Sequence, residues 1–315
     1  MPSFDVAIAG ELNLDLILYG LPDELAPERE LLARDMILTL GSSSAIVAHN
    51  LAQLGSRVAF VSCIGTDQLG TVALERLAQG GVDVSHVRRL PGAVKTGLTV
   101  ILPRTGWRNI LTYAGTIFDL RPEHLDIDYL ASARHFHLSS FFLHRGLRGH
   151  IPELFRKLKA RGLTISLDPN DDPDDQWQGL EEVLPFVDVL LPNKRELLRI
   201  ARTNDFDAAV ARLSQQIPLL VVKLGEHGAM ARRGDERVNS PALQLDVVDP
   251  VGAGDSFDAG FLHEFVAGKD LAACLAAGNL AGAFSTTRPG GTEAFRDRDY
   301  RHQFYEAHHL AIAKH

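Results

Sequence analysis

The sequence predicts a three-layer α/β/α sandwich, in which a mostly parallel sheet lies between two layers of helices. Short apolar runs alternate with segments of helical periodicity through most of the chain, which is typical of parallel strands joined by crossover helices. The runs are apolar throughout rather than at every second residue, as expected for strands covered on both faces. We therefore expect residues 1–315 to form one domain of this class.

The expected elements follow in chain order. Strands are expected at residues 4–9, 58–64, 136–139, 163–167, 187–191 and 219–224, and helices at residues 44–54, 69–79, 147–160, 206–215 and 255–266. Two stretches, residues 12–40 and 95–113, break the alternation, and the second has the period-two pattern of half-exposed strands. We expect both to be insertions that together form a small β-rich lid over one edge of the sheet.

The composition favours a cytoplasmic protein that acts on small molecules. Hydrophobic residues make up 45% and charged residues 23% of the chain, close to the average for soluble globular proteins. The net charge of −8 gives no basic surface for a nucleic acid or an anionic membrane. We expect neither a signal peptide nor a membrane span, because no sufficiently long apolar run is present. The two cysteines, Cys63 and Cys274, are expected to be buried thiols.

A glycine-rich segment is the strongest candidate for chemistry. Residues 249–257 have the sequence DPVGAGDSF. They follow an apolar run at 243–248, which we expect to be a strand, and they open a helix that Gly268 ends. Free N–H groups at such a turn, together with the helix dipole, would face an anion such as phosphate. Gly252 and Gly254 would allow the anion to approach the backbone closely.

Asp255 is the only ionisable residue inside this turn. It could cap the helix, as aspartate often does. It could instead be the base that accepts a proton from an attacking hydroxyl. The pattern favours the base, because a carboxylate that only capped the helix would also repel the anion.

The segment GAGDSFDAGF at residues 252–261 resembles the C-terminal signature of the ribokinase-like (PfkB) carbohydrate kinases. Other motifs of that family have similar segments here, in the family's order, at residues 10–15, 41–55, 64–70, 168–170, 192–196 and 223–228. The resemblance implies a ribokinase-like fold and an ATP-dependent kinase that transfers the γ-phosphoryl group to a hydroxyl of a sugar or sugar-like molecule. It also implies Mg²⁺ as a cofactor and a homodimer formed through the lid.

The resemblance also implies a role for individual residues. Asp255 would be the catalytic base, and the N–H groups of Gly252, Ala253 and Gly254 would form an anion hole. Substrate binding is implied for Asn13, Asp15, Gly41, Ser42, Ser43 and Asn50. Nucleotide binding is implied for Asn193, Glu196, Lys223, Gly225, Gly228 and Asn279, of which Asn193 and Glu196 would also organise Mg²⁺ through water. A monovalent cation such as K⁺, which many relatives bind, is implied for Asp249, Val251, Ser285 and Gly290.

Considered without the resemblance, several of these residues have other interpretations. Asn13 and Asp15 are typical of a turn. Glu196 fits the solvated face of a helix, and Lys223 fits the end of a strand. These alternatives stay open at the level of the sequence.

The sequence departs from the family pattern at positions that bear on the acceptor. Ser42 stands where a second glycine is usual, and Ile46 where an asparagine is common, which weakens ribose as the acceptor. Pro250 and Val251 replace a frequent pair of threonines. Fructose, ribose, a 2-keto-3-deoxy acid and a nucleoside therefore stay open as acceptors. Two alternatives are a nucleoside kinase and a catalytically silent nucleotide- or sugar-binding relative; Asp255 disfavours the silent one, because binding alone requires no base.

Overall fold

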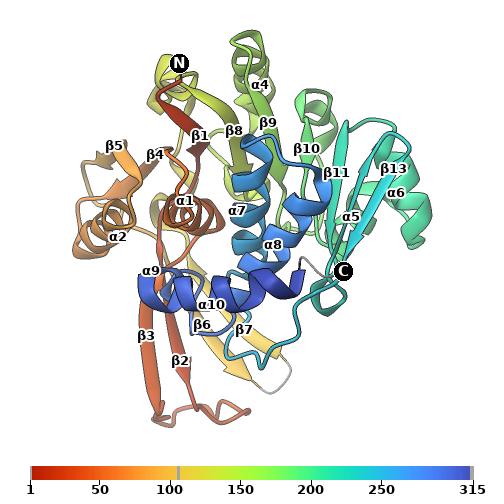
Figure 1. The fold of residues 1–315 in the computed structure, drawn as a ribbon. Coiled ribbons are helices and arrows are strands. Elements are labelled where there is room, and N and C mark those ends of the chain that lie inside the picture. Colours follow the sequence, from red (N-terminus) through yellow and green to blue (C-terminus); the bar gives the residue numbers. More distant parts are fainter. Residues whose placement is uncertain (1, 105–106, 313–315) are drawn as a thin grey trace.

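The central sheet has nine strands in the order β13-β12-β11-β10-β9-β8-β1-β4-β5, in a computed structural model that describes residues 2–104 and 107–312 (Figure 1). Its strands are β1 (Phe4–Ala9), β4 (Val58–Gly65), β5 (Asp83–Leu90), β8 (Ala133–Ser139), β9 (Thr164–Asp168), β10 (Val189–Leu190), β11 (Leu219–Lys223), β12 (Ala229–Arg233) and β13 (Glu236–Ser240). Neighbouring strands from β5 to β11 pair in parallel, and only β12 and β13 add antiparallel pairs. The expected mostly parallel sheet is confirmed.

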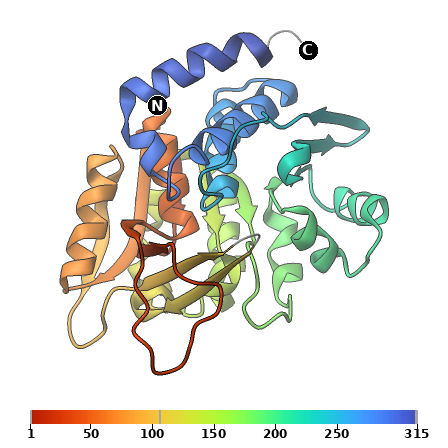
Figure 2. The same ribbon diagram turned by 90° about the horizontal axis from the view of Figure 1, so that it is seen from below.

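Helices cover both faces of this sheet, which confirms the three-layer sandwich (Figure 2). One face carries α1 (Ser43–Gln53), α2 (Gln68–Gln79), α7 (Ala253–Val266) and α8 (Leu271–Ser285). The other carries α3 (Ile127–Leu130), α4 (Ile151–Ala160), α5 (Lys194–Ala201) and α6 (Phe206–Ser214). Strand β1 is apolar from Val6 to Ala9, because Val6 and Ile8 pack in the core on the α1 side of the sheet while Ala7 and Ala9 pack in the core on the α4 side. No helix in the described part of the chain is long and apolar enough to cross a membrane.

The two stretches that break the alternation form one small sheet, as expected. Its order is β3-β2-β6-β7, with β2 (Leu14–Tyr19) and β3 (Asp35–Leu40) from the first stretch and β6 (Leu98–Arg104) and β7 (Trp107–Tyr113) from the second. Strands β2 and β6 are parallel, with Asp15 opposite Thr99, and the outer pairs are antiparallel. This sheet, called the lid below, lies at the lower end of the molecule in Figure 1.

The strand expected at residues 243–248 is wrong, because this apolar run forms no strand. Two of its side chains pack in a cluster of helices instead of in a sheet. Leu243 and Leu245 pack against aromatic residues of α8, α9 (Glu293–Arg296) and α10 (Arg298–Ile312), whereas Val247 and Val248 are each 59% exposed. The glycine-rich turn therefore follows a coil that runs beside α8.

Gly260 fixes the position of α7 against α8. A Cβ atom at this residue would lie 2.4 Å from the carbonyl oxygen of Ala277 and 2.6 Å from the Cβ of Ala281. Such distances are far below van der Waals contact, so any side chain here would push the two helices apart. The close approach matters for the site, because α7 begins at the glycine-rich turn.

We predict that Gly260→Ala lowers the free energy of unfolding by about 1–3 kcal/mol, the usual cost of overpacking a core. Chemical denaturation would measure the change. Gly149→Ala is the matched control, since a Cβ there meets no atom within 4 Å, and its stability should change by less than about 0.5 kcal/mol. Equal stabilities of the two variants would show that α7 and α8 can separate without cost.

Candidate active site

Residues from distant parts of the sequence meet at one edge of the central sheet. Asn13 follows β1, Asp168 ends β9 and Lys223 ends β11. Parallel strands end at a common edge, which is where open α/β sheets bind ligands. The start of α7 lies at the same edge, because a Cβ at Gly254 would lie 3.7 Å from Lys223 Nζ.

The glycine-rich turn is the N-terminus of α7. Gly252 is the residue before the first helical turn, and its φ of 75° is a left-handed conformation that favours glycine. A Cβ there would lie 2.4 Å from the Cα of Gly291. Within residues 2–104 and 107–312, no side chain caps this helix. The Ala253 N–H donates to the Pro250 carbonyl at 3.3 Å, whereas no such bond is found for the N–H groups of Gly252 and Gly254 among the described residues, so these can meet an anion. Asp255 lies in the first turn without capping it, which removes one of its two interpretations.

A buried group of three charged residues joins two strands to α7. Lys223 Nζ lies 2.7 Å from Asp168 Oδ2 and 3.1 Å from Asp258 Oδ2. Burial would raise the pKa of Asp168, but the Lys223 ammonium and a hydrogen bond from Asp258 lower it. Burial also raises the pKa of the Asp258 carboxyl, whereas the Lys223 ammonium acts in the opposite direction.

Asp255 lies beside this group and takes its electrostatic character from it. Burial raises the pKa of the Asp255 carboxyl to about 6, and the negative charge of Asp168 adds to the effect. Lys223 and a hydrogen bond from Ser43 act in the opposite direction. A carboxyl with this pKa is mostly ionised at neutral pH and still binds a proton well, which suits a general base.

A cavity of about 220 Å³, called the lid cavity below, lies between the lid and the start of α7. Six of the predicted substrate-binding and catalytic residues line it: Asn13, Asp15, Ser42, Ser43, Gly252 and Asp255. The rest of its wall includes Glu11, Thr99, Arg108 and Ser140, and also Val251 of the predicted cation site. The structure therefore brings four of the six predicted substrate-binding residues and Asp255 to one polar cavity.

Asp15 is buried rather than part of an exposed turn. Burial raises its pKa to about 7, and the charges of Asp255 and Asp249 raise it further, whereas a hydrogen bond from Thr99 and the charge of Arg108 lower it. Sequence reasoning missed Thr99 and Arg108. The available signal was the alternating pattern of residues 95–113. Together with the register of β2 and β6, in which Thr99 lies opposite Asp15, this pattern places both side chains on one face of the lid.

Two residues predicted to bind the substrate, Asn50 and Gly41, do not line the lid cavity. The side chain of Asn50 is fully buried, donates to Ser256 Oγ (2.9 Å) and to the carbonyl of Gly291 (3.0 Å), and does not line the lid cavity. Asn50 therefore holds the loop behind the turn, and its contact with an acceptor stays a prediction. Gly41 also lies outside the cavity wall, but a Cβ there would collide with the carboxylate of Asp15, so this glycine makes room for a residue that does line it.

A second cavity, of about 370 Å³ and called the α8 cavity below, lies on the other side of the turn. Four of the predicted nucleotide residues line it: Lys223, Gly225, Gly228 and Asn279. Ala253 and Gly254 line it as well, whereas Gly252 and Asp255 line the lid cavity. The first turn of α7 thus separates the two cavities.

Asn193 and Glu196 bind each other at the start of α5. The Asn193 N–H donates to Glu196 Oε2 (2.8 Å), and the Glu196 N–H donates to Asn193 Oδ1 (3.0 Å). Glu196 is only 6% exposed, so the solvated helix face is wrong. Burial raises its pKa to about 7, and Asp168 adds to this. The Asn193 amide and the Glu196 carboxylate supply oxygen atoms, which suit Mg²⁺ held through water.

The predicted monovalent-cation residues gather around Asp249. Its carboxylate accepts hydrogen bonds from the N–H groups of Val251 (2.9 Å) and Gly290 (3.0 Å) and from the Tyr19 hydroxyl of the lid (2.8 Å). The Ser285 hydroxyl donates to the carbonyl of Gly282. The loop is thus held by its own contacts, and cation binding there stays a prediction.

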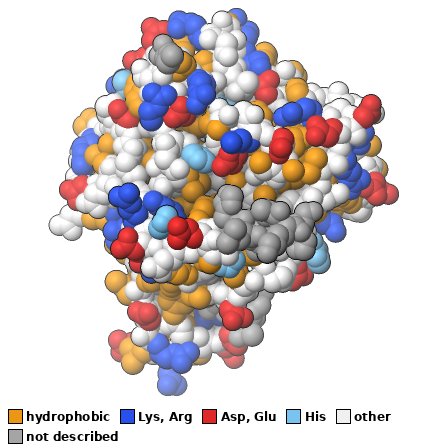
Figure 3. All heavy atoms as spheres, in the orientation of Figure 1, with side chains coloured by type: hydrophobic (Ala, Val, Ile, Leu, Met, Phe, Trp, Pro, Cys, Tyr) orange, Lys and Arg blue, Asp and Glu red, His pale blue; other side chains and the backbone are white. Residues whose placement is uncertain are grey.

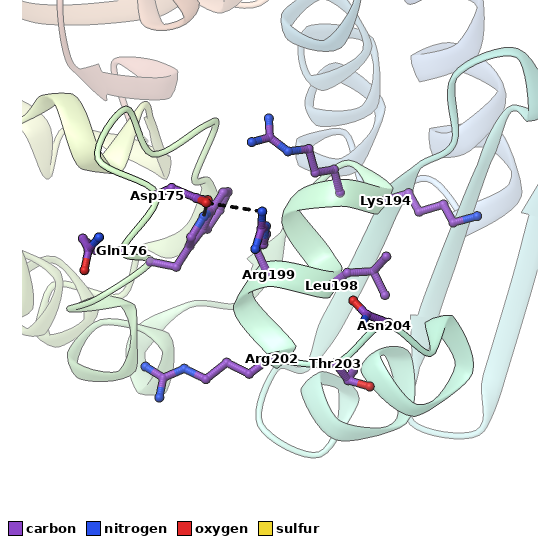
Figure 4. A pocket seen from close by; sticks show the side chains of 10 residues that line it. Asp175, Gln176, Lys194, Leu198, Arg199, Arg202, Thr203 and Asn204 are labelled. Atoms are coloured by element: carbon purple, nitrogen blue, oxygen red, sulfur yellow. Dashed lines mark hydrogen bonds and ion pairs between the residues drawn. The ribbon is translucent and has the colours of Figure 1, made fainter.

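Another cavity among the described residues, of about 830 Å³, is larger than the lid cavity and the α8 cavity and lies elsewhere (Figure 4). It lies between α5 and residues 175–177 and shares no lining residue with the lid cavity or the α8 cavity. Two of its three arginines are paired on an open surface, with Arg199 3.3 Å from Asp175 and Arg195 3.1 Å from Asp171. Size alone would therefore place the site wrongly.

Comparisons with known proteins agree with this geometry. The model of the pfkB family carbohydrate kinases matches residues 3–298. A fructokinase of Klebsiella pneumoniae is 30% identical over 82% of this chain and 89% of that protein. A 2-dehydro-3-deoxygluconokinase of Bacillus subtilis is 29% identical over 85% of this chain and 87% of that protein. A solved E. coli structure described as a ribokinase II with ATP and Mg²⁺ has the same fold, with a TM-score of 0.85 and 24% identity over 97% of this chain and all of that one.

We predict that Lys223→Met lowers the free energy of unfolding by about 3–5 kcal/mol, because it leaves the Asp168 carboxylate buried without its cation. Lys159→Met is the control. It removes an exposed pair with Asp188, which should be worth less than about 1 kcal/mol. Denaturant titrations of both variants at pH 7 would measure the two losses in the free energy of unfolding. A loss at Lys223 no larger than that at Lys159 would mean that the buried group does not hold β9, β11 and α7 together.

Proposed function

Because the chain belongs to the pfkB family of carbohydrate kinases, we propose that it transfers the γ-phosphoryl group of ATP to a hydroxyl of a sugar or sugar-like acceptor. One observation supports this most strongly: the first turn of α7 is a wall common to two cavities. Asp255 lines the lid cavity and Gly254 lines the α8 cavity. An acceptor in the first and a triphosphate in the second would meet at this turn.

In the proposed step, the acceptor oxygen bonds to the γ-phosphorus while the bond from that phosphorus to the β-phosphate oxygen breaks, and ADP leaves. The hydroxyl proton passes to Asp255, whose pKa of about 6 leaves it ionised but basic. The N–H groups of Gly252, Ala253 and Gly254 would stabilise the charge on the transferred group. Catalysis then consists mainly of positioning and electrostatic stabilisation.

The nucleotide is proposed to lie in the α8 cavity, along Gly225, Gly228 and Asn279. Lys223 ends β11 beside the turn and would add positive charge near the phosphates. Mg²⁺, held through water by Asn193 and Glu196, would neutralise charge on the phosphate oxygens. The start of α7 adds the positive end of its dipole on the same side.

The acceptor is proposed to lie in the lid cavity with its hydroxyls on Asn13, Asp15 and Ser43. Amide, carboxylate and hydroxyl groups together can donate to and accept from several hydroxyls at once. The names of the two sequence relatives above refer to fructose and to 2-dehydro-3-deoxygluconate, which supports a sugar-like acceptor. The lid would exclude water from the step and so limit hydrolysis of ATP.

A homodimer formed through the lid is also proposed. Five large apolar side chains of the lid strands are each more than half exposed: Met36, Trp107, Ile110, Leu111 and Tyr113. Figure 3 shows apolar side chains on the lower part of this face, where the lid lies in Figure 1. Exposed apolar surface on one element supports a protein–protein contact there.

We predict that Asp255→Asn lowers kcat by about 10²–10⁴-fold, because the amide cannot take the proton. Binding of ATP and of the acceptor should persist, since the amide has the same shape. A coupled assay of acceptor-dependent ADP release would measure turnover, and calorimetry would measure binding. Asp246→Asn, at an exposed residue outside both cavities, should leave kcat unchanged. Near-normal turnover of the Asp255 variant would remove this residue from the mechanism.

A further inference from the structure

We propose that the acceptor carries an anionic group, a carboxylate or a phosphate, which Arg104 and Arg108 bind beyond the hydroxyl that is phosphorylated. The inference rests on the proposed function, because it takes the lid cavity to be the acceptor site. It narrows the acceptor from sugar-like molecules in general to sugar acids and sugar phosphates.

The first observation is a buried guanidinium with no partner. All three nitrogens of the Arg104 guanidinium are buried, and none has a hydrogen-bond partner among the described residues. Guanidinium stays protonated at any physiological pH. An unpaired buried charge is costly, so such a group is best explained by an anion that binds there.

The second observation is that Arg104 and Arg108 belong to one hairpin and one cavity. In the β6–β7 ladder Arg104 lies opposite Trp107, and Arg108 lies opposite Pro103. Both arginines line a cavity of about 480 Å³, called the hairpin cavity below. The Arg108 side chain is exposed, and it too has no ion pair or hydrogen bond within the described ranges. Two guanidinium groups at one cavity can bind the oxygens of a carboxylate or phosphate bidentately.

The third observation is that the hairpin cavity adjoins the lid cavity. Ile101, Arg108 and Val251 line both. An acceptor with a hydroxyl at Asp255 could therefore extend along these residues toward Arg104. The two parts of the site have opposite charge, since Asp15 and Asp255 line the hydroxyl end and the arginines line the other.

Among the described residues, Asp249 is the only carboxylate on the wall of the hairpin cavity, and it does not neutralise the arginines by contact. Its oxygens accept hydrogen bonds from Val251, Gly290 and Tyr19. Neither arginine lies within 4 Å of a carboxylate oxygen in the described part of the chain. Pro103, Trp107 and Val251 make much of the remaining wall apolar, which would strengthen an ion pair formed there.

Turnover with matched acceptors tests the inference. The probes are 2-dehydro-3-deoxygluconate and gluconate as carboxylates, ribose 1-phosphate and fructose 6-phosphate as phosphates, and ribose and fructose as neutral sugars. We expect either the carboxylates or the phosphates to have the highest kcat/KM in the wild type. Comparing these two classes then identifies which anionic group the acceptor carries. Arg104→Gln should lower the ratio of anionic to neutral kcat/KM by roughly 10- to 150-fold, the range for losing a charged hydrogen-bond partner.

Two further variants complete this test. Arg104→Lys should restore part of the ratio, because it restores the charge but not the bidentate geometry. Arg148→Gln, at an exposed residue outside both cavities, should leave the ratio unchanged. Without ligand, Arg104→Gln should be at least as stable as the wild type, since its guanidinium has no protein partner to lose. A wild type that prefers neutral sugars, or a ratio that Arg104→Gln leaves unchanged, overturns the inference while the kinase function stands.

A binding measurement separates this inference from the proposed function. Calorimetry with the four anionic probes, in the presence of Mg²⁺ and a non-hydrolysable ATP analogue, needs no turnover. Binding that weakens in Arg104→Gln supports the anion site even if no acceptor is phosphorylated, in which case only the kinase function fails. Absence of binding by all four probes, or equal affinity in the variant and the wild type, overturns the anion site.

Discussion

The site depends on the buried ammonium of Lys223, which determines where negative charge can lie at the carboxyl edge of the sheet. Lys223 stabilises the carboxylate of Asp168 and also pairs with Asp258. Because Asp258 belongs to α7 and the other two residues end strands, the contact holds the helix start against the sheet. Burial keeps the pKa of Asp255 above that of an exposed aspartate, and the nearby Asp168 carboxylate adds to this effect while Lys223 opposes it.

The lid completes the site from the other side. The Tyr19 hydroxyl binds Asp249, directly before the glycine-rich turn, and Thr39 Oγ1 donates to Glu293 Oε1 at 2.7 Å, directly after the loop that contains Gly290. Both contacts attach the lid to the segments that enclose the start of α7. The cavity at Asp255 is therefore enclosed partly by the start of α7 and partly by the lid, and neither part alone would form it.

Much of the fold could be predicted from the sequence, because buried parallel strands and helices leave local patterns, as in β1 and α7. The pairing of the two lid stretches was also predictable from their shared break in the alternation. The coil at residues 243–248 was not, because Leu243 and Leu245 meet a helical cluster that local pattern does not reveal. In the site, Asp255 and Asp15 were found from motifs, whereas Asp258, Thr99 and Arg108 depend on register and helix packing. The position of Asn50 behind the turn was not predictable, because a buried amide that supports a loop has the same local sequence as one that contacts a ligand.

The central claim is that the buried charges hold Asp255 as a base with a pKa of about 6. The pH dependence of kcat/KM for the acceptor, at saturating MgATP, tests it most directly. Lowering the pH protonates Asp255 and removes the base, so kcat/KM should fall about tenfold per pH unit on the acid side. The midpoint should lie at or above 6, because bound phosphates add negative charge nearby. A kcat/KM that stays constant from pH 7 to pH 5, in protein shown by circular dichroism to remain folded, would contradict the account.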